Sequence, residues 1–270
     1  MPELPEVETI VRDMRSVLTG QSVLIAKFLN MSIKESGGPP DASSLRGKRL
    51  IAIDRRGKNI IFRFEKDLSM VIHLKMTGRL LFEKIQAEQE KHLHFQIEFS
   101  NNKLFFYDVR KFGRVGIYDS DGLARHPRLT KLGPEPFDLT PAQFARLLIT
   151  RHKPIKAALI DQEIIAGIGN IYADESLFAA GIRPDRPSAK IKPDHLIRLH
   201  KSIIKVLKKA IDNRGSSVDD YLDGFGKSGK FQRLLKVYGR TGQKCLKCDA
   251  TIKRITLRGR STHYCPRCQK

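Results

Sequence analysis

Four cysteines near the C-terminus constrain this chain more than any other feature of its sequence. They form two Cys-x-x-Cys pairs, and sixteen residues separate Cys248 from Cys265. This spacing is typical of a structural zinc site, because four thiolates complete a tetrahedral coordination sphere. Free thiols or disulfides are disfavoured, since each of the chain's 4 cysteines belongs to one of the two pairs. The predicted zinc ligands are Cys245, Cys248, Cys265 and Cys268.

Positive charge runs through the whole chain and is not confined to one end. The 50 Lys and Arg residues against 29 Asp and Glu give a formal charge of +21 at pH 7. Four thiolates together with the Zn²⁺ ion that they bind would lower this charge to about +19. Such an excess favours a polyanionic partner, with nucleic acid first and an anionic membrane surface second. Charge alone leaves a merely soluble basic protein as the alternative.

The chain lacks the apolar segments that insert into or cross membranes. No apolar run approaches the ~20 residues that span a bilayer. The acidic opening MPELPEVE has no apolar stretch of the kind found in signal peptides. Paired thiols suited to zinc fit a reducing compartment. We therefore expect a cytoplasmic protein with no membrane partner.

The first half of the sequence predicts one helix followed by short strands. Apolar residues recur at helical spacing over residues 4–18, and Gly20 then stops the helix. Turn signals such as Gly37-Gly38-Pro39-Pro40 separate the runs that follow. We expect an antiparallel sandwich or barrel with the helix laid on it. The predicted strands are 22–29, 48–54, 59–64, 69–74, 93–99, 103–107 and 115–118.

The second half predicts helices and then the cysteine-rich hairpin. Residues 132–138 are rich in proline and form a stiff linker, and Thr140-Pro141 is typical of a helix start. Polar, glycine-bearing residues 215–229 predict a mobile loop. Further helices are expected at 156–161, 170–180 and 194–212. The expected α+β domains are 1–131 (sandwich), 139–234 (helical) and 235–270 (zinc finger).

Three separated motifs give the chain a family resemblance. The opening Pro2–Thr9, the string Gly167–Tyr172 and the C-terminal zinc pattern together resemble the formamidopyrimidine-DNA glycosylase family. The resemblance covers the whole chain. It implies a β-sandwich with a leading helix, a helical domain with a helix–two-turn–helix, and a zinc-finger β-hairpin. It also implies a bacterial, nucleoid-associated base-excision repair enzyme that works as a monomer on damaged double-stranded DNA, with one structural zinc ion and no organic cofactor.

The resemblance gives the N-terminal residues catalytic roles. If Met1 is removed, Pro2 carries a secondary amine with a reference pKa of roughly 7.7–8.0. Such an amine attacks sugar C1′ and forms an iminium that promotes elimination. By resemblance Glu3 is the general acid/base and Glu6 orders the site. The alternatives are a simple helix-start proline and carboxylates that complement the helix dipole.

Further family positions predict contacts with DNA. Lys58 is placed against the phosphate flanking the lesion; alone it would be read as a solvated surface lysine. Met76 and Phe112 match apolar wedges that fill the gap left by a flipped base. Arg110 would pair with the base left without a partner. Ordinary core packing is the alternative for the two wedges.

The helical half and the hairpin supply the remaining predicted contacts. Asn170, at a helix start after a Gly-Ile-Gly turn, would bind a phosphate; its alternative is a helix cap. By resemblance Arg260 on the zinc hairpin grips lesion phosphates and takes part in the last elimination. His92, Arg151 and Lys156 are further candidates for backbone contacts.

The function expected from the resemblance is removal of oxidised purines, 8-oxoguanine and formamidopyrimidines, by a bifunctional glycosylase/AP lyase with β,δ-elimination. Residues around 215–229 would close over the flipped base. One alternative is an endonuclease VIII-like glycosylase for oxidised pyrimidines. A second is a non-catalytic zinc-finger DNA-binding protein, which the presence of both Pro2 and Glu3 disfavours.

Overall fold

The computed structural model describes residues 1–35, 40–82, 91–218 and 220–270. The chain forms two compact units. The first comprises Met1–Thr130 with Asn213–Lys230, and the second comprises Lys131–Asp212 with Phe231–Lys270. Positions 37–39 of the predicted turn lie outside the described residues.

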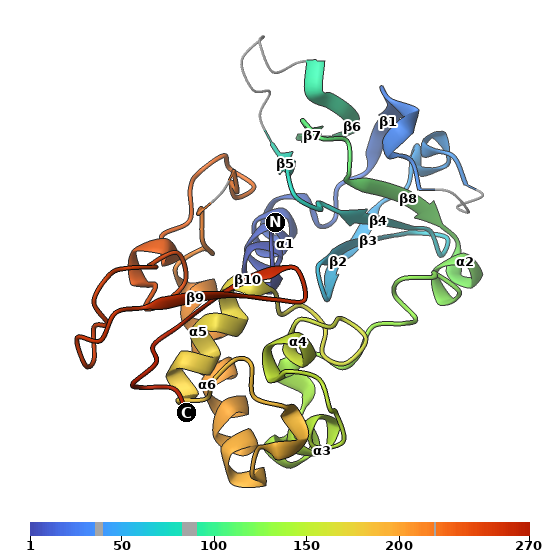
Figure 1. Cartoon of the computed structure of the whole chain (residues 1–270). Helices are drawn as coiled ribbons and strands as arrows, with labels where there is room; N and C mark the ends of the chain where they lie inside the picture. The colour runs from blue at the N-terminus through green and yellow to red at the C-terminus, as the bar shows by residue number, and fades with distance from the viewer. Residues whose placement is uncertain (36–39, 83–90, 219) are drawn as a thin grey trace. The chain divides into compact units, whose positions relative to one another are not determined.

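The first unit is built on two four-stranded antiparallel sheets, whose strands are labelled in Figure 1. One sheet has the order β1-β6-β7-β5 and the other β2-β3-β4-β8. Their bounds are β1 (Val23–Phe28), β2 (Leu50–Arg56), β3 (Asn59–Phe64), β4 (Ser69–His73), β5 (Gly78–Leu81), β6 (Leu93–Phe99), β7 (Lys103–Asp108) and β8 (Arg114–Tyr118). Short helices η1 (Met31–Ile33), η2 (Ala42–Leu45) and α2 (Ser120–Ala124) complete the connections.

The leading helix α1 (Leu4–Leu18) packs against β2 and β3 of the second sheet. Proline in its first turn suits a position where no intrahelical donor is needed. Its apolar side chains recur on one face and are removed from water by one core that they share with both sheets. The buried apolar residues of this face are Val7, Ile10, Val11, Met14 and Leu18.

The second unit is helical and ends in a two-stranded hairpin. In it α5 (Asn170–Ala180) and α3 (Pro141–Ile149) pack on the long α6 (Pro193–Asp212), and β10 (Arg260–Tyr264) packs on α5 (Figure 1). Thr140 caps α3, and Pro141 is the first residue of the helix. The Thr140 Oγ1 atom accepts a hydrogen bond from the backbone N–H of Gln143. The remaining elements are η4 (Pro136–Asp138), α4 (Ile155–Leu159), η5 (Ser188–Lys190), η6 (Phe231–Leu234) and β9 (Lys253–Leu257).

The predicted α+β class is therefore confirmed, although the structure contains elements that the sequence does not predict, among them α2 and β5. Strand β5 was not predicted, because its four residues give too short an alternation to recognise. Residues 213–230 group with the first unit, although the sequence pattern had placed them with the helical region 139–234. The grouping follows from contacts with α1: the buried carboxylates of Glu6 and Asp13 accept hydrogen bonds from the backbone N–H groups of Ser216 and Gly224. Among the described residues, no helix combines the length and apolar character that a membrane crossing requires.

Candidate active site

The N-terminus of α1 buries Pro2, Glu3 and Glu6 close together in the first unit. Glu3 is the residue that precedes the helix, and its backbone N–H donates to Glu6 Oε2 at 2.8 Å. Pro2 is buried, and the two carboxylate residues are only 3% and 1% exposed. The helix therefore places a carboxylate next to Pro2 and holds a second one a turn away. Such a pair of carboxylates can donate protons to a reacting group and accept them from it, in a site from which water is largely excluded.

Glu6 is also held by Ser216 and Tyr221 of the same unit. Its Oε1 atom accepts a 2.7 Å hydrogen bond from the Ser216 backbone. The Tyr221 hydroxyl donates to the Glu6 carbonyl at 3.4 Å. A Cβ atom at Gly215 would lie 2.7 Å from Glu6 Oε1, so only glycine allows this close approach. The sequence does not identify Ser216 or Tyr221, because these residues are 210 and 215 positions from Glu6 and meet it only through the packing of the fold.

Lys58 lies at the turn between β2 and β3 and is 5% exposed. Arg55 joins this turn to α1: its Nε donates to Glu8 Oε2 at 3.0 Å and its Nη1 to the Gly57 carbonyl. Gly57 has φ +58°, a conformation that favours glycine. The turn before Lys58 is thus fixed to the helix that carries Glu3 and Glu6.

His73 adds a titratable group beside Lys58 that the sequence analysis missed. It ends β4 and pairs with Asn59, the residue after Lys58. Burial, reinforced by the charges of Lys75, Arg128 and Lys58, holds the pKa of His73 well below its usual value. His73 Nδ1 accepts the Lys75 N–H at 3.0 Å, so the proton of the neutral imidazole is on Nε2, which can donate a hydrogen bond to a phosphate oxygen. The sequence signal was its place at a strand end directly before Leu74-Lys75-Met76.

The three predicted wedge residues lie together on the first unit. Arg110 Nη1 lies 3.2 Å from Met76 Sδ, and its guanidinium carbon lies 4.7 Å from the centre of the Phe112 ring. Met76 and Phe112 are 44% and 45% exposed, so neither belongs to the core. The alternative interpretation, that Met76 and Phe112 pack in the hydrophobic core, is therefore excluded.

A buried aspartate fixes the backbone of the loop that carries Arg110 and Phe112. Asp108 is 0% exposed, and its Oδ2 accepts the Gly113 N–H at 2.6 Å while its Oδ1 accepts the Arg110 N–H at 3.2 Å. A Cβ at Gly113 would lie 2.5 Å from the Phe106 ring. Residues 108–113 therefore form a fixed turn, from which the side chains of Arg110 and Phe112 are exposed to solvent.

In the second unit, Gln162 organises the turn before α5. Its Oε1 accepts the Gly167 N–H at 2.9 Å, and its Nε2 donates to the carbonyls of Ile160 and Ile168. Gly167 has φ +87°. Asn170 then starts α5, and its Oδ1 atom is buried without a hydrogen-bond partner among the described residues. The start of α5 therefore presents helix N–H groups, where an anion is favoured.

Lys156 and Arg151 occupy different environments in the second unit. Lys156 is 1% exposed, and its Nζ contacts Asp174 Oδ1 at 2.7 Å and the Ser261 carbonyl at 2.8 Å. A side chain buried in this way holds the hairpin to α5, and the contact of Lys156 with the DNA backbone stays a prediction. Arg151 is exposed, and His92 in the first unit is half-buried.

Arg260 is the exposed first residue of β10 and pairs with Leu257 across a tight turn. Arg258 and Gly259 in that turn have φ +46° and +75°, as a two-residue hairpin turn requires. The turn leaves Arg260 at the end of the hairpin. His263, farther along β10, contacts Asp174 Oδ2 at 3.1 Å from Nδ1 and 2.8 Å from its backbone N–H, so β10 is fixed to α5.

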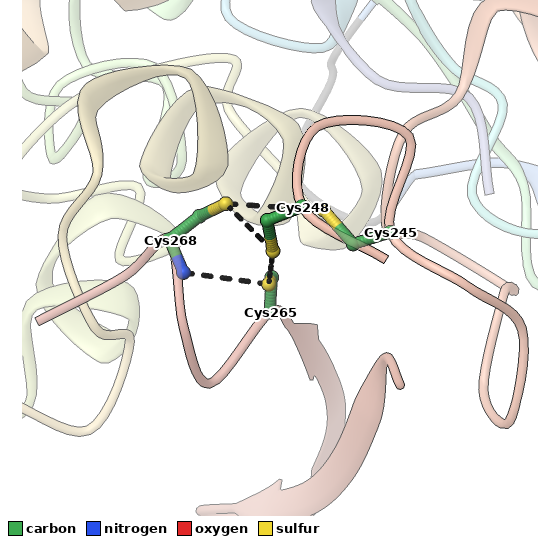
Figure 2. Close-up of side chains that lie close together, drawn as sticks. All are labelled: Cys245, Cys248, Cys265 and Cys268. Carbon is green, nitrogen blue, oxygen red and sulfur yellow. Dashed lines mark hydrogen bonds between the residues drawn. The ribbon is translucent and has the colours of Figure 1, made fainter. Parts of the chain in front are cut away.

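The four predicted zinc ligands converge, as Figure 2 shows. Their Sγ atoms all lie within 4.8 Å of one another. Measured separations are 3.3 Å for Cys248–Cys268, 3.5 Å for Cys248–Cys265 and 3.9 Å for Cys245–Cys268. Zn–S bonds of about 2.3 Å in a tetrahedron require S–S separations of this size. The Lys247 and Cys268 N–H groups point to sulfur at 3.4 Å, which stabilises thiolates. The four thiols therefore fit a structural zinc ion, with no ligand position left for chemistry.

The family models match the chain in three consecutive segments. The formamidopyrimidine-DNA glycosylase N-terminal domain matches residues 1–115, the H2TH domain of the same glycosylase matches residues 132–221, and a zinc finger found in FPG and IleRS matches residues 242–270. These segments contain the α1 site, the turn before α5 and the four cysteines, respectively.

Curated relatives and solved structures match over the full length. Formamidopyrimidine-DNA glycosylase of Desulfitobacterium hafniense is 41% identical over 277 residues, covering 100% of both chains. That of Chloroflexus aurantiacus is 42% identical, covering 100% of this chain and 98% of its own. A Lactococcus lactis FPG mutant bound to Fapy-dG-containing DNA has a TM-score of 0.91 at 37% identity, with 100% of both chains covered. The MutM (FPG) protein of Thermus thermophilus has a TM-score of 0.89 at 36% identity, covering 99% of this chain and 98% of its own.

Proposed function

The chain belongs to the formamidopyrimidine-DNA glycosylase family, and we propose that it removes oxidised purines from duplex DNA as a bifunctional DNA glycosylase/AP lyase of base-excision repair. The observation that carries this proposal is the buried start of α1, where Pro2 and Glu3 stand beside a Glu6 held from both sides. Relatives of similar sequence were solved with Fapy-dG and abasic DNA.

The first chemical step is assigned to the Pro2 amine, once Met1 has been removed. Its nitrogen attacks C1′ of the damaged nucleotide, the C1′–base bond breaks, and the base leaves with the bonding electrons and a proton. Glu3 supplies and recovers protons at this centre. The C1′–O4′ bond then breaks, and Glu3 passes a proton to O4′ as the sugar ring opens. The Pro2 nitrogen, which has lost its own proton, forms an iminium with C1′ that stays cationic and acidifies the neighbouring hydrogen at C2′. Loss of that proton expels the 3′ phosphate, and a second elimination expels the 5′ phosphate.

Positioning of DNA is assigned to the cations and wedge residues. Lys58 and His73 would contact phosphates that flank the lesion, and Met76, Arg110 and Phe112 would fill the space of the flipped nucleotide. Asn170, Arg151 and Arg260 of the second unit would bind the phosphate backbone. The zinc ion is structural and takes no part in the reaction. We further propose that the protein acts as a monomer, in the cytoplasm and associated with the nucleoid.

Borohydride trapping tests the proposal. Protein whose intact mass shows loss of Met1 should cross-link to duplex DNA containing 8-oxoguanine, whereas protein that retains Met1 should bind without cross-linking. Glu3→Gln should slow excision by roughly 10²–10⁴-fold while leaving DNA affinity in place. Binding without trapping by the processed protein would overturn the mechanism. Preference for a thymine glycol duplex over an 8-oxoguanine duplex would instead assign the chain to oxidised pyrimidines.

A further inference from the structure

Arg214, near the start of the segment formed by residues 213–218 and 220–230, binds Asp13 on α1 and Asp223 within the segment. Its Nη2 lies 2.7 Å from Asp13 Oδ2 on α1, and its Nε lies 2.8 Å from Asp223 Oδ2. Asp13 and Asp223 are 6% and 0% exposed, whereas Arg214 retains 38% of its side-chain exposure. One guanidinium therefore neutralises two buried carboxylates from the solvent side.

The backbone of Arg214 indicates that the side chain has a specific role. Arg214 has φ +59° and Gly215 has φ +77°, so two successive residues adopt the left-handed conformation. Glycine meets this geometry without the strain that a residue with a Cβ atom experiences. An arginine here is explained by its two carboxylate partners.

Both carboxylates also hold the backbone of the segment. Asp13 Oδ2 accepts the Gly224 N–H at 3.2 Å, and Asp223 Oδ1 accepts the N–H groups of Phe225 and Lys227 at 3.0 and 2.9 Å. A Cβ at Gly224 would lie 2.8 Å from Met14 Cε, so the segment lies directly on α1. Burial raises the pKa of Asp13, and the hydrogen bond from Arg214 opposes that shift.

The cluster is two residues from the contact that holds Glu6. Ser216, whose N–H donates to Glu6 Oε1 at 2.7 Å, follows Arg214 and Gly215 directly. Glu6 in turn accepts the Glu3 N–H through its other oxygen. A displacement of Arg214 therefore moves the donor that orients the second carboxylate of the active site.

We propose that Asp13, Arg214 and Asp223 form a positioning cluster for base excision, which fixes the segment 213–218 and 220–230 on α1 so that Ser216 holds Glu6 against the damaged base. The inference rests on the proposed function and on the expectation that residues around 215–229 close over the flipped base. The proposed function assigns the contacts with sugar and phosphates to other residues. The cluster is therefore required when a base must be recognised and released, and dispensable when the substrate has already lost its base.

The test compares two substrates in single-turnover assays of the full-length protein. Arg214→Gly removes the guanidinium and keeps a residue that fits the backbone. It should lower excision of 8-oxoguanine by about 10²-fold, and leave cleavage of an abasic duplex within about two-fold. Arg214→Lys, which keeps a cation able to reach one carboxylate, should give an intermediate excision rate. Asp223→Asn keeps the shape of the cluster and should show the same split between substrates.

Lys66→Gly is the matched control, since Lys66 has φ +60° in a turn of the same unit. Both activities of this variant should remain unchanged. An equal loss of both activities in Arg214→Gly would show a purely structural role, and unchanged activities would show no role; either overturns the cluster while the proposed function stands. Absence of 8-oxoguanine excision by the unaltered protein would overturn the proposed function, and the inference with it.

Discussion

Ser216 donates its backbone N–H to Glu6 Oε1 at 2.7 Å, and 210 residues separate these two partners in the sequence. The bond joins the segment after α6 to the first turn of α1. Together with the Glu3 N–H on the other carboxylate oxygen, it leaves Glu6 with a donor on each side. The carboxylate is thereby fixed before any substrate binds, which is the condition for effective catalysis by preorganised groups.

Glu6→Gln should therefore slow base excision by about 10²-fold. The amide keeps one acceptor oxygen, but its NH₂ group must then face either the Ser216 or the Glu3 N–H, and one of these donors is left unpaired. Single-turnover excision of 8-oxoguanine measures the effect. Glu65→Gln, which alters an exposed pair with Arg49, is the control. An unchanged rate in Glu6→Gln would remove Glu6 from the site.

Met76→Ala and Phe112→Ala should slow excision from duplex DNA while leaving the melting temperature almost unchanged. Both side chains are exposed, so truncation opens no cavity in the core. They fill space in the DNA only after the nucleotide leaves the stack. Base-stacking fluorescence of 2-aminopurine beside the lesion reports this step. Ile51→Ala, at an exposed apolar residue of β2, should alter neither quantity. A loss of thermal stability in the wedge variants would instead assign them to packing.

Removal of zinc should unfold the C-terminal hairpin and weaken DNA binding. The apolar cluster around the cysteines is small, consisting of Phe178, Val237, Cys245, Ile252 and Cys265. It cannot by itself order residues 237–270, so the metal provides much of their folding free energy. Hydrogen exchange after chelation should show lost protection in this hairpin and retained protection in β2–β4. Unchanged DNA affinity after verified metal loss would contradict a binding role for Arg260.

Glu35→Gln should destabilise the first unit at neutral pH and have little effect in acid. Burial opposes ionisation of Glu35, but the His126 imidazole, whose Nε2 lies 3.5 Å from Oε2, and the charge of Arg128 outweigh it and lower the pKa of Glu35. Arg128 Nη2 lies 2.7 Å from the carboxylate. A lowered folded-state pKa means that the stabilisation is present above the ordinary value of 4.5 and is lost as the pH falls through the folded value.

The expected loss of unfolding free energy at neutral pH is about 1–3 kcal/mol, because Arg128 and His126 lose their charged partner. Urea titrations at several pH values measure it. Asp54→Asn, in an exposed pair with Arg63, should change stability little at any pH. If Glu35→Gln lowered the unfolding free energy by the same amount in acid as at neutral pH, the stabilisation by Glu35 would not be ionic.

Local pattern was enough to predict α1, β3, β6 and α5 at their observed bounds. Helical periodicity marks α1 and alternation marks β6, whereas β3 and α5 are apolar runs that turn or glycine residues bound. The four cysteines were recognisable because zinc ligation imposes a spacing along the chain as well as a geometry in space. The predicted wedge residues adjoin glycine and cations in loops, and the structure leaves them exposed.

Contacts between distant segments were decided by the tertiary structure alone. Nothing near Ser216, Arg214 or Asp223 in the sequence indicates a partner on α1, and Lys156 resembles an ordinary surface cation until Asp174 and Ser261 are seen to bury it. Hydrogen bonds and ion pairs depend on which atoms the fold brings within about 3 Å. Periodicity determines which face of an element is buried, whereas the identity of its neighbour there depends on how the whole chain packs.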